Sequence, residues 1–256
     1  MLDILHQLLI FIAVYIGETF GVMFGGGGFF VQPALLASGI EAKQAIANDI
    51  CAAAFSGIAY LMTTKTHSKN IREATTYAAP SVIIGALIGS YALTLIPESI
   101  VKWIILGVCT VGFGYVATHF KKKKNLDVST SIKNWKIVLP IAGLGIGFYD
   151  GFIGAGGGII VIMALSMIVR SDMKSTISMA NWISALSLSS AAALYWYKGL
   201  LNPGLLMVMI PACILAGITG AKVTAHLSEK TLRNIYCVVV SCLLLYLMSK
   251  EILSLI

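Results

Sequence analysis

Long apolar runs follow one another along this chain, and they limit its fold more than any other feature. A membrane-spanning helix needs roughly 20 apolar residues, and the 256 residues leave room for about ten such spans joined by short loops. The runs lack the polar–apolar alternation of transmembrane β-strands. Only 11% of the residues are charged, against about 25% in soluble domains. The sequence therefore predicts an all-α integral membrane protein, multi-pass in the cell (inner or plasma) membrane.

Each half of the chain divides into five apolar segments, and the second segment of each half is short. At about 1.5 Å per residue, a short segment covers only part of a hydrocarbon core roughly 30 Å thick. We expect half-helices, re-entrant segments or shortened spans there. The predicted segments are 4–24, 29–38, 45–63, 74–95 and 101–119, then 137–153, 158–169, 175–197, 204–226 and 231–249.

An internal duplication relates the two halves, as in many transporters. Five glycines match at an offset of 130: Gly17, Gly21, Gly26, Gly27 and Gly28 with Gly147, Gly151, Gly156, Gly157 and Gly158. Later residues match at 131, among them Lys43 with Lys174 and Pro80 with Pro211, and Asn48 matches Asn181 at 133. We therefore predict a first membrane repeat (1–120), a basic cytoplasmic linker (121–136) and a second membrane repeat (137–256).

The distribution of charge predicts how the repeats are oriented. The linker holds six of the 18 Lys and Arg residues, which places it in the cytoplasm under the positive-inside rule. If all five segments of each half cross the membrane, the halves are inverted and 14 basic residues lie inside. If the short segments only dip in, the halves are parallel with eight spans, and 11 lie inside. The charge rule favours inverted repeats, with eight parallel spans as the alternative.

The glycine runs that open the short segments are candidate anion sites. Gly26, Gly27 and Gly28 precede the first short segment, and Gly156, Gly157 and Gly158 precede its counterpart. Bare backbone N–H groups and the positive end of a helix dipole both favour an anion. The alternative is that these glycines only permit tight turns or close helix contacts. The glycines before each run recur every fourth residue, a spacing typical of helix packing.

Three acids lie within apolar segments, where a charged side chain costs about 2.5–3.5 kcal/mol and indicates function. Asp150 lies six residues before Gly156, so it could reach the anion site and carry a coupling proton; a structural carboxylate is the equal alternative. Asp49 lies near a segment start, and Glu18 matches Phe148 in the second half. Because Phe20 matches Asp150, we expect any acid-dependent step to be asymmetric.

Polar residues at the start of the third segments complete the predicted site. Asn48 and Asn181 could donate to an oxyanion, although interhelical hydrogen bonding is the common alternative. The five cysteines form no CxxC, and no HExxH, GxSxG or P-loop motif occurs. We predict no metal, no cofactor, no catalytic residue and no nucleic-acid partner. The expected partners are a small anion and membrane lipids, with the oligomeric state open.

Three segments resemble the TauE/SafE family of membrane proteins, and the resemblance covers nearly the whole chain. They are FGGGGFFVQPALLASG (24–39), GFYDGFIGAGGG (147–158) and KSTISMANWISA (174–185). The resemblance implies a transporter of sulfite, organosulfonates such as sulfoacetate, or related sulfur-containing anions. It also implies a binding role for the glycines of both runs, with Asn48, Asp150 and Asn181 in or beside the site.

The predicted function is therefore a secondary transporter of a small sulfur-containing anion, working by alternating access between the two halves, with proton coupling as a hypothesis. A passive anion channel is the alternative within transport. A membrane scaffold or assembly protein is the alternative outside it, and an intramembrane enzyme comes third.

Overall fold

The computed structural model describes residues 4–64, 69–101, 103–104, 135–169, 171–228 and 231. The helices in chain order are α1 (Ile4–Phe24), α2 (Gly28–Ala37), α3 (Ala42–Thr63), α4 (Lys69–Leu95), α6 (Trp135–Phe152), α7 (Gly157–Ile168), α8 (Met173–Tyr197) and α9 (Pro203–His226). No strand occurs among these residues. The predicted segments 101–119 and 231–249 and most of the basic linker lie outside the described ranges.

The lengths of the helices confirm the prediction of a multi-pass, all-helical membrane protein. By length and composition, α1, α3, α4, α8 and α9 are each able to cross a membrane. The two short segments form α2, with 10 residues, and α7, with 12 residues. Apolar side chains such as Ile141 and Met207 are largely exposed on the outside of the bundle, where lipid would cover them.

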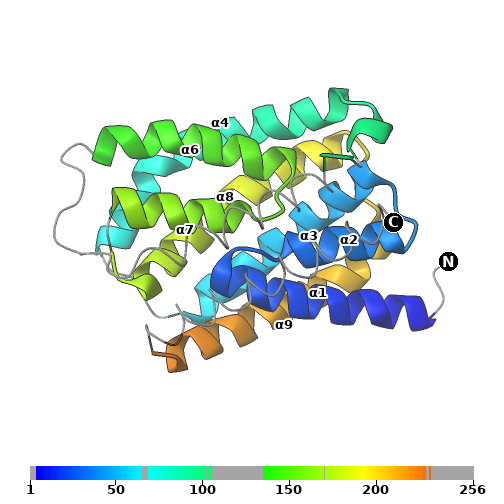
Figure 1. Ribbon diagram of the computed structural model, residues 1–256, viewed down its shortest axis with the longest axis horizontal. Coiled ribbons are helices and arrows are strands. Elements are labelled where there is room, and N and C mark those ends of the chain that lie inside the picture. Colours follow the sequence, from blue (N-terminus) through cyan, green and yellow to red (C-terminus); the bar gives the residue numbers. More distant parts are fainter. Residues whose placement is uncertain are drawn as a thin grey trace, which may run out of the picture.

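Small residues allow α4 and α6 to run in close contact along one edge of the bundle, with α1 and α9 along the opposite edge (Figure 1). On α6, Gly143, Gly147 and Gly151 face the backbone of α4 at Ala78, Val82 and Ala86. From one contact to the next, the residue number rises by four on both helices, so α4 and α6 are parallel. The structure therefore confirms the packing role predicted for these α6 glycines.

The central helices α3 and α8 run antiparallel. Near the start of α3, Asn48 Oδ1 accepts a hydrogen bond from the backbone N–H of Asn202, just beyond the end of α8, at 2.9 Å. Further along, Gly57 on α3 faces Ala185 on α8. The start of α3 and the end of α8 therefore lie on the same side of the bundle.

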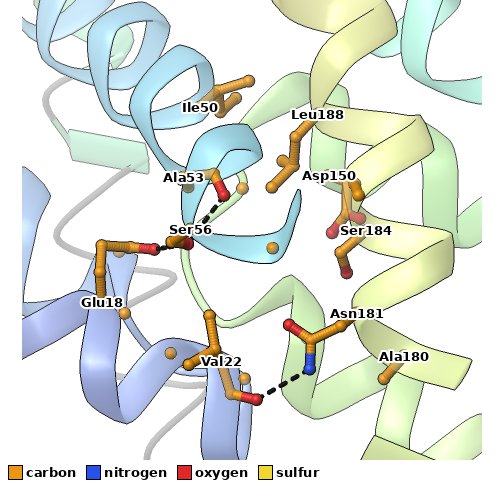
Figure 2. Close-up of a pocket in the computed structure, with 18 of the residues that line it drawn as sticks. Glu18, Val22, Ile50, Ala53, Ser56, Asp150, Ala180, Asn181, Ser184 and Leu188 are labelled. Atoms are coloured by element: carbon orange, nitrogen blue, oxygen red, sulfur yellow. Dashed lines mark hydrogen bonds between the residues drawn. The ribbon is translucent and has the colours of Figure 1, made fainter. Parts of the chain in front are cut away.

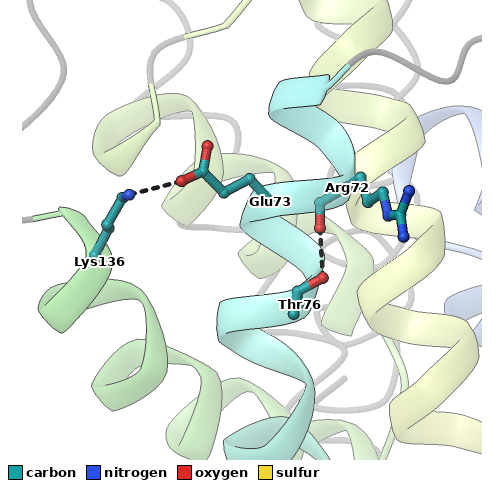
Figure 3. A network of polar contacts seen from close by, with 4 residues as sticks. All are labelled: Arg72, Glu73, Thr76 and Lys136. Carbon is teal, nitrogen blue, oxygen red and sulfur yellow. Dashed lines mark hydrogen bonds and ion pairs between the residues drawn. The ribbon is translucent and has the colours of Figure 1, made fainter.

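A polar cluster joins the starts of α4 and α6 on one side of the bundle (Figure 3). Lys136 Nζ lies 2.6 Å from Glu73 Oε1 and 5.2 Å from the centre of the Tyr77 ring. Both partners of the ion pair are partly exposed, as is typical of residues that anchor helix ends at a membrane–water interface.

Two lysines make matching contacts at helix ends. Lys43 Nζ, on α3, donates to the carbonyl oxygen of Thr94 at the end of α4, at 3.2 Å. Lys174 Nζ, on α8, donates to the carbonyl oxygen of Ala225 at the end of α9, at 2.9 Å. Each lysine lies 51 residues before its acceptor, and a cation at a helix C-terminus is favourable.

Candidate functional site

A polar cavity of about 70 Å³ lies in the middle of the bundle (Figure 2). The two glycine loops, residues 25–27 before α2 and 154–156 before α7, meet the central helices there. Its walls come from α1, α3 and α8, from the end of α6, and from the starts of α2 and α7. A cavity of this size holds several waters or a small polyatomic ion.

The glycine loop before α2 packs directly against the first turn of α7 beside this cavity. The N–H of Ile159 donates to the carbonyl oxygen of Gly25 at 3.2 Å. Gly25 has a φ of +86°, and a Cβ there would overlap the backbone of Gly158. Only glycine combines this φ with so close an approach of two backbones. The loops therefore bring α2 and α7 together at their N-terminal ends, as the predicted anion site requires.

Each of the three intramembrane acids lies against a glycine at the start of a short helix. A Cβ on Gly157 would overlap Asp150 Oδ1, and a Cβ on Gly27 would overlap Glu18 Oε1. A Cβ on Gly28 would lie 2.8 Å from Asp49 Oδ2. All three acids are buried and line the cavity. The glycines therefore make room for carboxyl groups.

Hydrogen bonds hold two of these acids in place. Gln32 Nε2, on α2, donates to Asp49 Oδ2 at 2.9 Å and to the carbonyl oxygen of Ile153 at 2.6 Å. Ser56 Oγ donates to Glu18 Oε2 at 2.7 Å. Asp150 lies beside Ser187 on α8, but neither Asp150 Oδ2 nor Ser187 Oγ completes a hydrogen bond.

The two predicted asparagines have different surroundings. Asn181 lines the cavity, and its Nδ2 donates to the carbonyl oxygens of Val22 (2.8 Å) and Ile177 (2.9 Å). Figure 2 shows the bond from Asn181 to Val22. Asn48 is not among the cavity residues; its amide is bonded to Gln44 O and to the N–H of Asn202.

A difference in register explains why Asn48 is not brought to the cavity. Four of the five α3 residues that line it pair with α8 lining residues at an offset of 131, as in Asp49 with Ala180 and Ala53 with Ser184. By that offset, Asn181 corresponds to Ile50, two residues after Asn48. Two residues turn an α-helix by about 200°, so Asn48 lies on another face of its helix. The match of the two asparagines at 133 was therefore misleading.

The structure brings together part of the predicted site. Gly27, Gly28, Asp150, Gly158 and Asn181 line the cavity, whereas Gly26, Asn48, Gly156 and Gly157 do not. Gly157 still contributes by lying against Asp150.

Sequence reasoning missed Ser56 and Gln32 and gave Glu18 and Asp49 too little weight. For the acids, the signal was present, because any carboxylate in an apolar segment is a functional candidate.

The chemistry of the cavity wall is dominated by hydrogen-bond acceptors. Three carboxyl groups contribute oxygens, and no Lys, Arg or His is among the described residues that line the cavity. Asp49 Oδ1, Asp150 Oδ2 and Ser184 Oγ are buried without hydrogen-bond partners. Within the described ranges, no three His, Cys, Asp or Glu residues are grouped so that they could hold a metal ion. Cys51 and Cys213 are free, buried thiols.

A polytopic helical bundle with a buried cavity where two short helices begin is typical of membrane proteins of the transporter class. Residues 9–247 match the family described as "Sulfite exporter TauE/SafE", and the chain belongs to this family. The family consists of membrane transporters and not of enzymes, as the sequence predicted.

Two similar proteins carry related names. The "Probable membrane transporter protein ORF9" of Sinorhizobium sp is 30% identical over 164 residues, which span 62% of this chain and 60% of that protein. The "Probable membrane transporter protein YfcA" of Escherichia coli K12 is 23% identical over 239 residues, or 92% of this chain and 87% of that protein. No solved structure matches the chain.

Proposed function

We propose that this protein is a secondary transporter that moves a small sulfur-containing anion, such as sulfite or a short organosulfonate, across the cell membrane by alternating access. The observation that carries the proposal is the central cavity. Both short helices begin at its wall, and the loop before α2 touches the first turn of α7 through Gly25 and Ile159. Half-helix N-termini that point at a site near the membrane midplane are a recurring way to bind anionic substrates in transporters.

The proposed movement is that of two inverted halves against each other around the cavity. Three observations support inversion. The helices α3 and α8 are antiparallel. Four of their five pairs of cavity residues share an offset of 131. Lys43 and Lys174 make matching contacts. Inverted halves can exchange conformations and so open the cavity to either side in turn.

Transport into sealed vesicles tests the proposal directly. The purified protein is reconstituted into liposomes preloaded with unlabelled sulfite, and uptake of labelled sulfite, sulfoacetate, thiosulfate and sulfate is followed. We expect counterflow, in which the label accumulates transiently above its outside concentration, for at least one sulfur oxyanion. Liposomes without protein are the control, and absence of counterflow for all four anions would contradict the proposal.

The same assay separates the alternative functions. A passive channel would let anions equilibrate without counterflow, and its flux would not saturate. A scaffold or assembly protein would give no anion flux above that of liposomes without protein. The polar cavity favours a transporter over a scaffold, because buried carboxyl groups without a chemical task only destabilise a membrane bundle.

A further inference from the structure

Glu18 and Asp150 have equivalent surroundings in the two halves of the structure, although they are not aligned in the sequence. By the offset of 130 that relates the glycines, Glu18 corresponds to Phe148, and Asp150 corresponds to Phe20. In space, both acids touch matching groups. Glu18 lies against Gly27 and Ser56, and Asp150 lies against the corresponding Gly157 and Ser187. The two acids therefore reach matching groups from positions that lie two residues apart in the alignment of their helices.

Asp49 is not a member of this pair. Its partner Gln32 and its own position have no acidic or amide counterpart, since Ile162 and Ala180 stand there in the second half. The pair therefore consists of one carboxyl group for each short helix, held between the glycine at its start and a serine of the next long helix.

We propose that Glu18 and Asp150 are an equivalent pair of titrating carboxyl groups, and that the anion occupies the cavity only when both are protonated. This inference rests on the proposed transport of an anion. An ionised carboxylate competes with the substrate for the positive end of each short helix. A protonated carboxyl group removes that competition and offers an O–H donor.

The size of the repulsion makes protonation a condition of binding. At about 5 Å and an effective dielectric constant of about 20, one ionised carboxylate would weaken anion binding by a factor on the order of a few hundred. No cationic side chain among the described cavity residues offsets this repulsion. Asp150 Oδ2, which is buried and has no partner, is a free position for a proton to be shared with the ligand.

The other titratable groups around the pair are all acidic or neutral. They are Asp49 and Cys51 on α3, Cys213 on α9, Tyr149 on α6 and Tyr195 on α8. Tyr149 donates to Ala155 O, and Tyr195 donates to Gly151 O. Both hydroxyl groups are therefore already used. Asp49, the third carboxyl group at the cavity, already accepts a hydrogen bond from Gln32, so Asp49→Asn should keep the wild-type dependence of anion affinity on pH. A weaker pH dependence in Asp49→Asn would contradict the assignment to Glu18 and Asp150.

The test measures anion affinity against pH with a probe whose own charge is fixed, methanesulfonate, on the purified full-length protein. If two protons bind with the anion, the affinity of the wild type falls by about a hundredfold per pH unit at alkaline pH. We expect about tenfold per unit in Glu18→Gln and in Asp150→Asn, and no dependence in the double variant. Glu41→Gln, at an exposed acid before α3, should behave as the wild type. A single-proton slope in the wild type, or an unchanged slope in Glu18→Gln, would overturn the inference.

Infrared spectroscopy of the carboxyl stretch distinguishes failure of this inference from failure of transport. Without ligand, raising the pH should remove two protonated-carboxyl bands, one of which is missing in each single variant. Loss of both bands at high pH, with no binding of methanesulfonate or sulfite at any pH, would contradict the proposed function but support the assignment of the titrating pair. If an anion binds without changing the Glu18 band, the pairing is wrong and anion transport stands.

Discussion

At the scale of single residues, glycine is required here for two separate physical reasons. Gly25 and Gly39 both have a φ near +80°, which costs an L-residue about 1–2 kcal/mol. They differ in their surroundings, because nothing lies within 4 Å of a Cβ on Gly39, whereas a Cβ on Gly25 would overlap the backbone of Gly158. The cost in stability of the backbone conformation and the cost of the close backbone contact can therefore be measured separately at these two glycines.

We expect Gly25→Ala to lower the stability of the protein well beyond the effect of Gly39→Ala. Gly39→Ala carries only the conformational cost, and Gly25→Ala adds an overpacking cost of about 1–3 kcal/mol. The measurement is the thermal unfolding midpoint of each purified variant in the same detergent. Equal midpoints would show that the loop before α2 does not touch α7 as described.

Gln32 is the second residue with a specific structural task, since it ties α2 to Asp49 on α3 and to Ile153 after α6. Gln32→Leu keeps a similar volume but removes both hydrogen bonds. We expect a loss of about 2–4 kcal/mol, because one bond goes to a carboxyl group that is buried in the bundle. Thermal unfolding and methanesulfonate binding should both deteriorate, and an unchanged unfolding midpoint would contradict the role of Gln32.

At the scale of helices, the closest crossing is that of α4 and α6. Gly147 and Gly151 let the two backbones meet, since a Cβ at either position would overlap a carbonyl oxygen of Val82 or Ala86. Gly145, on the same helix, faces open space. Lipid offers no hydrophobic driving force between helices, so this close packing is itself a source of stability.

We therefore expect Gly151→Ala to destabilise the protein by about 1–3 kcal/mol, because α4 must move away from α6. Gly145→Ala adds the same methyl group to the same helix without a clash, and should be neutral or slightly stabilising. Thermal unfolding of the two variants is the measurement, and a Gly151→Ala midpoint at or above that of Gly145→Ala would contradict the crossing.

Sequence periodicity predicted these elements well, since apolar runs and glycine spacing report directly on membrane insertion and helix contact. α1 was predicted at both ends, and α4 begins five residues before its predicted segment 74–95. The site was harder to predict, because identical residues at a fixed sequence offset do not always occupy equivalent positions in space. Asn48 matched Asn181 in sequence but lies on another face of its helix. Glu18 matched no acid in the second half, and yet it meets the same kinds of group as Asp150.

At the scale of the whole molecule, polar contacts fix the relative directions of the long helices. Glu73 and Lys136 bring the starts of α4 and α6 to one side of the bundle. Lys43 brings the start of α3 to the end of α4, and Lys174 brings the start of α8 to the end of α9. With α3 and α8 antiparallel, the starts of α4 and α8 fall on one side, and the ends of α4 and α8 fall on the other.

Cysteine accessibility tests this orientation on a background without the five native cysteines. We expect Lys69→Cys and Asp172→Cys to be labelled from the cytoplasmic side, together with Asp127→Cys in the basic linker, which lies outside the described residues. Glu98→Cys, just beyond α4, should be labelled only from outside, because the positive-inside rule puts the Lys-rich ends in the cytoplasm. Labelling of Asp172→Cys from outside, with Lys69→Cys inside, would mean parallel halves and eight spans. The two short helices would then not be inverted copies of each other. That result would also contradict the proposed alternating access, which requires two inverted halves that exchange conformations.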